Sequence, residues 1–123
     1  MSAPNKQACS LISVCHMDEI EEDSSKGFQR LNRHFFAVKK DGEVFLYQNR
    51  CPHLGTQLDW QEDQFLDTEG ALIMCATHGA LFLIESGECV QGPCFGDALV
   101  PIDYVIVDDQ IHIKAKDLLT LPA

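Results

Sequence analysis

The stretch Cys51-Pro52-His53-Leu54-Gly55 places a thiolate and an imidazole two residues apart in the chain. A second stretch, Cys75-Ala76-Thr77-His78-Gly79, offers the same pair of ligands with one more residue between them, and 21 residues separate His53 from Cys75. Two cysteines and two histidines in this order suit one metal centre that two loops gather. An iron–sulfur cluster would make the chain a carrier of electrons, whereas zinc would make it a structural or interaction domain.

The length and composition around these stretches predict one globular domain over residues 1–123. The chain is 46% hydrophobic and 23% charged, which is ordinary for a soluble domain. No apolar run approaches the roughly 20 residues that are needed to cross a bilayer. The N-terminal residues lack the basic start and the apolar stretch of a secretory signal. We therefore expect a cytoplasmic protein that has no membrane partner.

The net charge narrows the choice of partners. The chain has 19 acidic and 9 basic residues, which gives a formal net charge of −10. This surplus argues against nucleic acid as a partner, because contacts with phosphate need Lys and Arg. It is compatible with steered docking onto a basic protein surface, and equally with a role in solubility alone. Asp59, Glu62 and Asp63 could form part of an acidic docking surface or only a solvated loop.

Short runs of β-branched and aromatic residues, separated by turn signals, predict an all-β fold. Asp41-Gly42 between two such runs is a strong hairpin signal, and several short strands indicate a sandwich or a small barrel. Both ligand stretches fall just past strand ends, on loops that a rigid sheet would present. The expected strands cover residues 10–14, 34–39, 44–48, 72–74, 81–84, 89–90, 104–107 and 111–114, and residues 18–27 are expected to form an exposed loop or a short helical turn.

Four cysteines outside the ligand stretches are expected to be small buried apolar side chains: Cys9, Cys15, Cys89 and Cys94. A chain without a secretory signal is expected in a reducing compartment, where disulfides are rare. Cys89 and Cys94 lie five residues apart, so a bridge between them is compatible with the sequence without being implied by it.

The residues that follow each ligand pair carry a family resemblance. The first stretch continues Thr56-Gln57-Leu58, the second continues Ala80-Leu81-Phe82, and Gly87 and Gly92-Pro93 come later. This pattern, C-x-H-x-G-x-x-L and then C-x-x-H-G-x-x-F with a turn glycine and a Gly-Pro loop, resembles the Rieske [2Fe–2S] family. The resemblance implies an antiparallel β-sandwich with a small cluster-binding subdomain formed by two loops. We expect that subdomain at about residues 50–93 and the basal β-sandwich at residues 1–49 and 94–123.

The resemblance also implies a set of ligands. Cys51 and Cys75 would bind the inner iron of a [2Fe–2S] cluster, and His53 and His78 would bind the outer iron. Neutral imidazoles leave the oxidised cluster without net formal charge, so it accepts an electron more readily than a cluster with four thiolates. The glycine after each histidine would let its loop approach the cluster closely. The other residues expected around the cluster are Leu54, Gly55, Thr56, Gly79, Ala80, Phe82 and Pro93, with Pro93 on a third loop that shields it.

Four departures from the family's respiratory members predict a low reduction potential. Those proteins carry an extra cysteine on each loop, joined as a disulfide, where this chain has Thr56 and Ala76. They also supply a serine and a tyrosine hydroxyl to the cluster sulfurs, where this chain has Ala80 and Phe82. Hydrogen bonds to sulfur raise the potential, so their absence predicts a value toward the roughly −150 mV end of the Rieske range.

The implied function is that of a small Rieske-type ferredoxin, which carries electrons and is not itself an enzyme. It would take one electron from an NAD(P)H-dependent flavin reductase, deliver it to a terminal oxygenase or reductase, and be a monomer in isolation. Two alternatives stay open. The first is the small Rieske subunit of a nitrite reductase-type enzyme, against which the intact ligand set counts. The second is a zinc-bound structural domain, which would give no reason for the glycines and the Gly-Pro loop.

Overall fold

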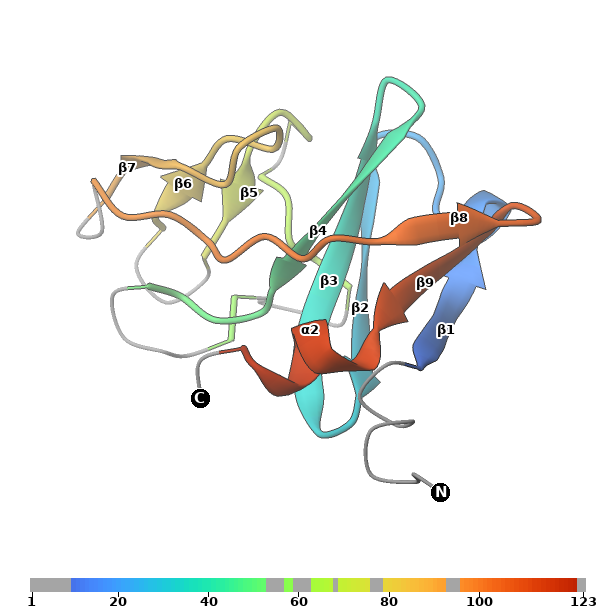
Figure 1. The fold of residues 1–123 in the computed structure, drawn as a ribbon. Helices are drawn as coiled ribbons and strands as arrows, with labels where there is room; N and C mark the ends of the chain where they lie inside the picture. Colours follow the sequence, from blue (N-terminus) through green and yellow to red (C-terminus); the bar gives the residue numbers. More distant parts are fainter. Residues whose placement is uncertain are drawn as a thin grey trace.

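The computed structural model describes residues 10–52, 57–58, 63–67, 69–75, 79–92 and 96–121. They form three antiparallel sheets of three strands, in the orders β1-β9-β8, β2-β3-β4 and β5-β6-β7 (Figure 1). The described elements are β1 (Leu11–His16), the 3-10 turn η1 (Met17–Glu19), β2 (Ser24–Arg30), β3 (Arg33–Lys40), β4 (Glu43–Gln48), β5 (Ile73–Met74), β6 (Leu81–Phe82), β7 (Cys89–Gln91), β8 (Val105–Val107), β9 (Gln110–Lys114) and the helix α2 (Ala115–Leu119). The predicted all-β antiparallel class is confirmed.

Sheet β2-β3-β4 is the middle layer and contributes side chains to two separate apolar cores, one on each face. All four residues of the run Phe35–Val38 in β3 are fully buried. Successive side chains of a strand point to opposite faces, so Phe35 and Ala37 enter one apolar cluster while Phe36 and Val38 enter another. Figure 1 shows sheet β1-β9-β8 on one side of this layer and the small sheet β5-β6-β7 on the other.

Two-residue turns connect β3 with β4 and β8 with β9. The hairpin predicted at Asp41-Gly42 is confirmed, with φ values of 55° and 78° at these two residues. Positive φ at both central positions gives the turn a twist that matches the twist of the flanking strands. A second hairpin, between β8 and β9, turns at Asp108 and Asp109, where φ is again positive at both positions.

The two outer sheets cover opposite faces of the middle layer. Ile111 and Ile113 of β9 are fully buried and belong to the apolar cluster that contains Phe35. Ile73 of β5 and Phe82 of β6 are fully buried in the cluster that contains Phe36. The strands of sheet β5-β6-β7 are only two or three residues long, so this layer depends on side-chain packing more than on its own hydrogen bonds.

Tyr47 of β4 joins the small sheet to the middle layer. Its hydroxyl donates a hydrogen bond of 2.6 Å to the carbonyl oxygen of Ile84, and the residue is 2% exposed. Gly87 lies directly against the ring: it has a φ of 76°, and a Cβ placed on it would be 2.7 Å from Cε1 of Tyr47. Only glycine has both the backbone freedom and the absence of a side chain that this contact requires.

Two parts of the structure differ from the sequence prediction. Residues 24–27, expected in an exposed loop or helical turn, belong to β2 and pair with β3. Their polar sequence gives no strand signal, but their backbone pairs with β3. Gly27 leaves room for the ring of Phe65. The helix α2 was not expected, because five residues show no helical period. It is held by the buried side chain of Leu118 and by Arg33, whose Nε donates to the carbonyl oxygen of Leu118.

Two of the four cysteines predicted to be buried lie in described parts of the chain. Cys15 and Cys89 are both buried, which confirms the prediction for them. Burial raises the pKa of the Cys15 thiol, and the nearby carboxylate of Glu19 adds to that shift. Cys9 and Cys94, with the bridge considered for Cys94, lie outside the described residues. None of the described helices has the length and apolar character of a membrane span.

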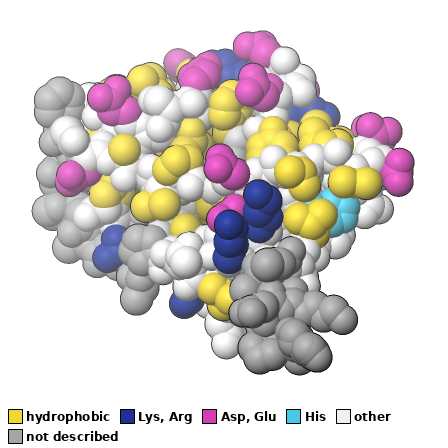
Figure 2. All heavy atoms as spheres, in the orientation of Figure 1, with side chains coloured by type: hydrophobic (Ala, Val, Ile, Leu, Met, Phe, Trp, Pro, Cys, Tyr) yellow, Lys and Arg dark blue, Asp and Glu magenta, His cyan; other side chains and the backbone are white. Residues whose placement is uncertain are grey.

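The outermost strand of sheet β1-β9-β8 exposes apolar side chains. Val105 is 39% exposed, and Ile106 and Val107 are each 48% exposed. Hydrophobic side chains gather over this part of the surface in Figure 2. The patch belongs to β8, whereas the second ligand stretch lies between β5 and β6 on another sheet. It is therefore a surface feature separate from the predicted metal centre.

Replacing Tyr47 with phenylalanine should change how stability responds to alkali. Burial raises the pKa of Tyr47 from 10 to about 12. A group whose pKa is higher in the folded state contributes stability that is full below the unfolded pKa and is lost as the pH rises through the folded one. The wild type should therefore lose this contribution between about pH 10 and pH 12. The Tyr47→Phe variant should start about 1 kcal/mol less stable, because the hydrogen bond is gone.

The measurement is urea unfolding of both proteins at intervals from neutral pH to about pH 12. All other side chains are the same in the two proteins, so only the difference between the two stability curves reports Tyr47. We expect that difference to shrink across the alkaline window. Two curves that stay parallel through the window would show that the Tyr47 hydroxyl does not set the alkaline response.

Candidate metal centre

Cys51 and Cys75 are the two predicted ligands that the structure describes, and both are deeply buried. Cys51 follows the end of β4 by three residues, and Cys75 comes directly after β5. Their exposed fractions are 1% and 0%, and both belong to the apolar cluster that contains Phe36. The fold thus brings two cysteines from separate loops into one buried region, as a shared metal centre requires.

The second ligand loop, which runs from Cys75 to Ala80, is closed by hydrogen bonds between its two ends. The Cys75 N–H donates to the carbonyl oxygen of Ala80 at 2.9 Å, and the Gly79 N–H donates to the carbonyl oxygen of Cys75 at 2.8 Å. Gly79 has a φ of 67°, in the left-handed region that favours glycine. This explains the glycine after the second predicted histidine, because the chain must turn sharply there to return to β6.

The first ligand loop is closed by a side chain that sequence reasoning missed. Oδ1 of Asn49 accepts a hydrogen bond of 2.7 Å from the N–H of Leu58. Asn49 is 8% exposed, and Leu58 is fully buried in the same apolar cluster as the two cysteines. A polar residue two positions before a ligand cysteine was the signal in the sequence, but nothing there indicates a partner nine residues away.

The third loop approaches the second one through Gly92. This residue has a φ of 112°, and a Cβ placed on it would lie 2.8 Å from Cα and 2.9 Å from Cβ of Ala80. Such distances are shorter than side chains tolerate, so the contact requires glycine. The Gly-Pro pattern noted in the sequence therefore has a structural reason at its first residue, whereas Pro93 lies outside the described residues.

Ala80 and Phe82 bring no hydroxyl group to the buried region. Both residues are fully buried, and both belong to the apolar core that contains Cys51 and Cys75. These are two of the positions from which the sequence predicts a low potential. The described side chains offer only carbon atoms there.

Several predicted site residues fall outside the described parts of the chain: His53, Leu54, Gly55, Thr56, Ala76, His78 and Pro93. Within the described residues, no three side chains of His, Cys, Asp or Glu gather in a way that could hold a metal ion. The cysteine half of the predicted set is present, and Cys51 is a free thiol. Two buried cysteines on adjacent loops fit the thiolate side of a cluster with mixed ligands.

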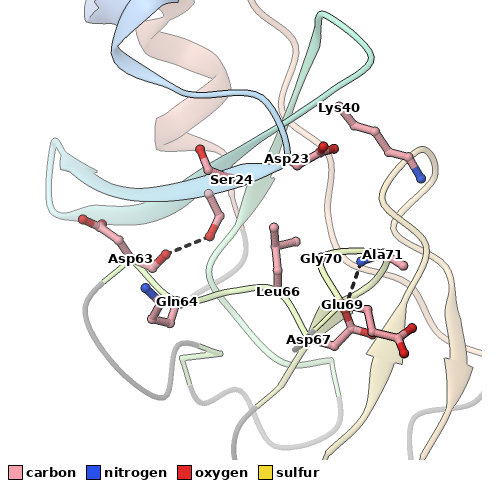
Figure 3. A pocket seen from close by; sticks show the side chains of 11 residues that line it. Asp23, Ser24, Lys40, Asp63, Gln64, Leu66, Asp67, Glu69, Gly70 and Ala71 are labelled. Atoms are coloured by element: carbon pink, nitrogen blue, oxygen red, sulfur yellow. Dashed lines mark hydrogen bonds between the residues drawn. The ribbon is translucent and has the colours of Figure 1, made fainter.

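A hollow of about 560 Å³ lies between β2 and the segment from Asp63 to Ala71 (Figure 3). Four carboxylates line it, from Asp23, Asp63, Asp67 and Glu69, together with the ammonium of Lys40. Two of the carboxylates accept backbone hydrogen bonds: Asp63 accepts from the N–H of Gly27 in β2 at 2.7 Å, and Asp67 accepts from the Ala71 N–H at 3.0 Å. Lys40 lies 3.4 Å from Glu85, so its charge is already partly neutralised.

Of the three acidic residues that the sequence suggested for a docking surface or a solvated loop, Asp63 lines this hollow, while Asp59 and Glu62 are outside the described residues. The segment that carries Asp63 and Asp67 leads from the first ligand loop to β5 and so to Cys75. An acidic hollow therefore lies beside the segment that joins the first ligand loop to β5.

A family model described as the Rieske [2Fe-2S] domain matches residues 10–109. The matched segment contains both ligand stretches and Gly92-Pro93. Among curated proteins, the chain is 26% identical over 117 residues to apoptosis-inducing factor 3 of Homo sapiens, and 27% identical to the protein of that name from Mus musculus. Each match covers 92% of this chain and 18% of the relative, so the chain spans less than a fifth of their length.

Solved structures show the same fold. The ferredoxin of carbazole 1,9a-dioxygenase from Nocardioides aromaticivorans IC177 has a TM-score of 0.68 at 20% identity, over 85% of this chain and 96% of that one. A chain from a complex of reduced oxygenase and oxidized ferredoxin in carbazole 1,9a-dioxygenase has a TM-score of 0.71 at 17% identity, over 89% of this chain and 95% of that one.

The family match spans most of the sequence and includes the buried cysteines at the ends of β4 and β5. A Rieske domain holds a [2Fe–2S] cluster ligated by cysteine and histidine, and Cys51 and Cys75 are two buried cysteines in this fold. The chain therefore belongs to the family of Rieske [2Fe–2S] domains, and its cofactor is a Rieske-type [2Fe–2S] cluster.

Proposed function

We propose that the chain carries one electron between two redox proteins and is not itself an enzyme. The donor is an NAD(P)H-dependent flavin reductase, and the acceptor is a terminal oxygenase. The observation that carries the proposal is the Rieske match over residues 10–109, within which Cys51 and Cys75 are buried in one apolar cluster. The class of acceptor is supported by the likeness of this fold to a chain, covered to 95%, from the complex of reduced oxygenase and oxidized ferredoxin in carbazole 1,9a-dioxygenase.

The proposed ligands are Cys51 and Cys75 for one iron, and His53 and His78 for the other. When bound, the cluster takes up and gives back one electron. The protein surrounds the two cysteines with buried apolar side chains. Leu58, Ile73 and Phe82 are fully buried in the same apolar core as Cys51 and Cys75. Apolar groups at this place keep water away from the thiolates and protect them from side reactions. We assign the cluster-binding subdomain to about residues 50–93 and the base to the rest.

The proposed carrier works at a low potential for its family. Ala80 and Phe82 place no hydroxyl donor in the buried region around Cys51 and Cys75. A hydrogen bond to a cluster sulfur stabilises the added negative charge, so a site without such donors holds the electron less tightly. A low potential suits a protein that must pass its electron on to an oxygenase.

Acidic surface favours partners with basic surface. The net charge is −10, and carboxylates line the hollow beside the segment that leads to Cys75. Opposite charges on the partner would speed its approach and orient it before contact. We therefore expect the reductase and the oxygenase to present lysines and arginines to this side of the chain, and we expect the isolated chain to be a monomer.

The function is tested by reconstitution without oxygen. We expect two irons and two acid-labile sulfides per chain, and reduction by NADH only when a flavin reductase of the ferredoxin type is added. The reduced chain, mixed with an oxygenase of the carbazole dioxygenase type, should be reoxidised faster than it is alone. One zinc per chain would contradict the proposal, and so would an iron–sulfur chain that exchanges electrons with neither partner.

Replacing Ala80 with serine should raise the midpoint potential. The new hydroxyl would lie within the buried region around Cys51 and Cys75, where the described side chains offer no O–H group at position 80 or 82. A shift of tenfold in the redox equilibrium is about 59 mV for one electron, and we expect a rise of that order. The measurement is a redox titration, with Ala98→Ser as control because Ala98 is exposed. Equal potentials for the two variants would refute the assigned role of position 80.

Replacing Gly92 with alanine should weaken retention of the cluster. The added Cβ would lie 2.8 Å from the Ala80 backbone and would sit on a φ of 112°, so the third loop must move away from the second. Gly96 offers a matched control, since its φ is 100° and a Cβ there meets nothing within 4 Å. We expect iron release to a chelator to be about tenfold faster in Gly92→Ala than in Gly96→Ala. Similar rates would mean that backbone strain, and not the contact with Ala80, governs retention.

A further inference from the structure

Asn49 stands at the junction between the middle sheet and the first ligand loop. Its backbone N–H donates a hydrogen bond of 2.9 Å to the carbonyl oxygen of His34 in β3. This bond extends the pairing of β3 with β4 by one residue beyond the last ladder pair, Phe35 with Gln48. The backbone of Asn49 is thus fixed to the rigid middle layer, two residues before Cys51.

The side chain of Asn49 reaches across the loop to the point where the chain returns. Its Oδ1 accepts from the Leu58 N–H at 2.7 Å, in a buried hydrogen bond. The side chain of Leu58 is itself fully buried in the cluster that contains Cys51 and Cys75. Both ends of the loop, at positions 49 and 58, are therefore held, one by the sheet and the other by Asn49 and the apolar core.

The buried setting makes this hydrogen bond hard to replace. Asn49 is 8% exposed and Leu58 is 0% exposed, so water has little access to either group. A buried N–H that loses its acceptor costs free energy, because its former contact with water is not restored. The residues between these two ends include Cys51 and His53. Any loosening at position 58 therefore gives freedom to the segment that supplies two of the proposed ligands.

We propose that Asn49 is the positioning residue of the first ligand loop, and that its neutral amide also helps to set the reduction potential. The inference deepens the proposed function, since it concerns the same site. An asparagine and an aspartate could both accept from the Leu58 N–H. Only the amide does so without placing a full negative charge two residues from a cysteine ligand. Such a charge, shielded from water, would oppose the arrival of an electron.

Three variants separate the two parts of this role. Asn49→Leu has a similar shape and removes the acceptor. Asn49→Asp keeps the acceptor and adds a charge. Gln57→Glu is the matched control, because it adds the same charge beside Leu58 on a side chain that is exposed to solvent. Each protein is purified with its cluster and examined by electron paramagnetic resonance after reduction, by redox titration, and by the rate of iron release to a chelator.

If Asn49 positions the loop, the geometry of the ligand loop should depend on whether position 49 carries a hydrogen-bond acceptor. Asn49→Leu should release iron about tenfold faster than the wild type and give a broadened resonance spectrum, because its ligand loop has more than one arrangement. Asn49→Asp should keep the wild-type line shape and release rate. If Asn49→Leu does not fold, Asn49→Ala, which removes the acceptor without adding bulk, replaces it. A variant without the acceptor that matches the wild type in both readouts would overturn the positioning role.

If the neutral amide helps to set the reduction potential, a buried negative charge at position 49 should lower the potential more than an exposed one at position 57. Asn49→Asp should shift the redox equilibrium about tenfold toward the oxidised form, which lowers the midpoint by about 59 mV. Gln57→Glu should lower it clearly less, because solvent and salt screen an exposed charge. Equal shifts in the two variants would overturn this half of the inference.

The outcomes distinguish this inference from the proposed function. All three readouts are made on the purified chain and need no partner, so they can succeed even if the flavin reductase and the oxygenase prove to be the wrong partners. In that case the proposed direction of electron flow fails and the role of Asn49 stands. A wild-type chain that binds no iron–sulfur cluster would overturn both.

Discussion

Everything at the proposed metal centre depends on one packing arrangement: the apolar cluster that forms between sheet β2-β3-β4 and sheet β5-β6-β7. Phe36 and Tyr47 enter it from the middle layer, Ile73 and Phe82 enter it from the small sheet, and Cys51 and Cys75 are buried within it. The strands of the small sheet are too short to stand alone. The same burial that holds this sheet in place therefore also brings the two thiols into one dry region.

The loops that leave this core are fixed by hydrogen bonds and by close contacts at glycine. Asn49 closes the first loop, the bond from the Cys75 N–H to Ala80 closes the second, and Gly92 brings the third against Ala80. Each of these contacts involves at least one residue that lies just beyond a strand end, so the loops keep their form without regular secondary structure. This is how a rigid scaffold presents a reactive group on irregular backbone. A centre with a given donor set can still differ in potential through nearby side chains, such as those at positions 80 and 82.

Much of this could be predicted from the sequence, and the failures have physical causes. The strands over Arg33–Lys40 and Glu43–Gln48 were predictable because runs of aromatic and β-branched residues on either side of Asp41-Gly42 are local signals. The need for glycine at positions 87 and 92 follows from the motif, although the partners of these residues, Tyr47 and Ala80, do not. Strand β2 was missed because its polar residues are ordered by pairing with β3. Asn49 was missed because its partner is set by the path of a loop, which no periodicity encodes.

The proposed function requires a cluster ligated by both cysteine and histidine, through which the chain carries one electron. Electron paramagnetic resonance of the dithionite-reduced protein can detect this ligand set, since replacing two thiolates with imidazoles lowers the average g value. We expect one unpaired electron per cluster, with an average g below that of a [2Fe–2S] cluster held by four cysteines. A spectrum of the all-cysteine type, or a reduced protein that shows no signal and contains zinc, would contradict the proposed function.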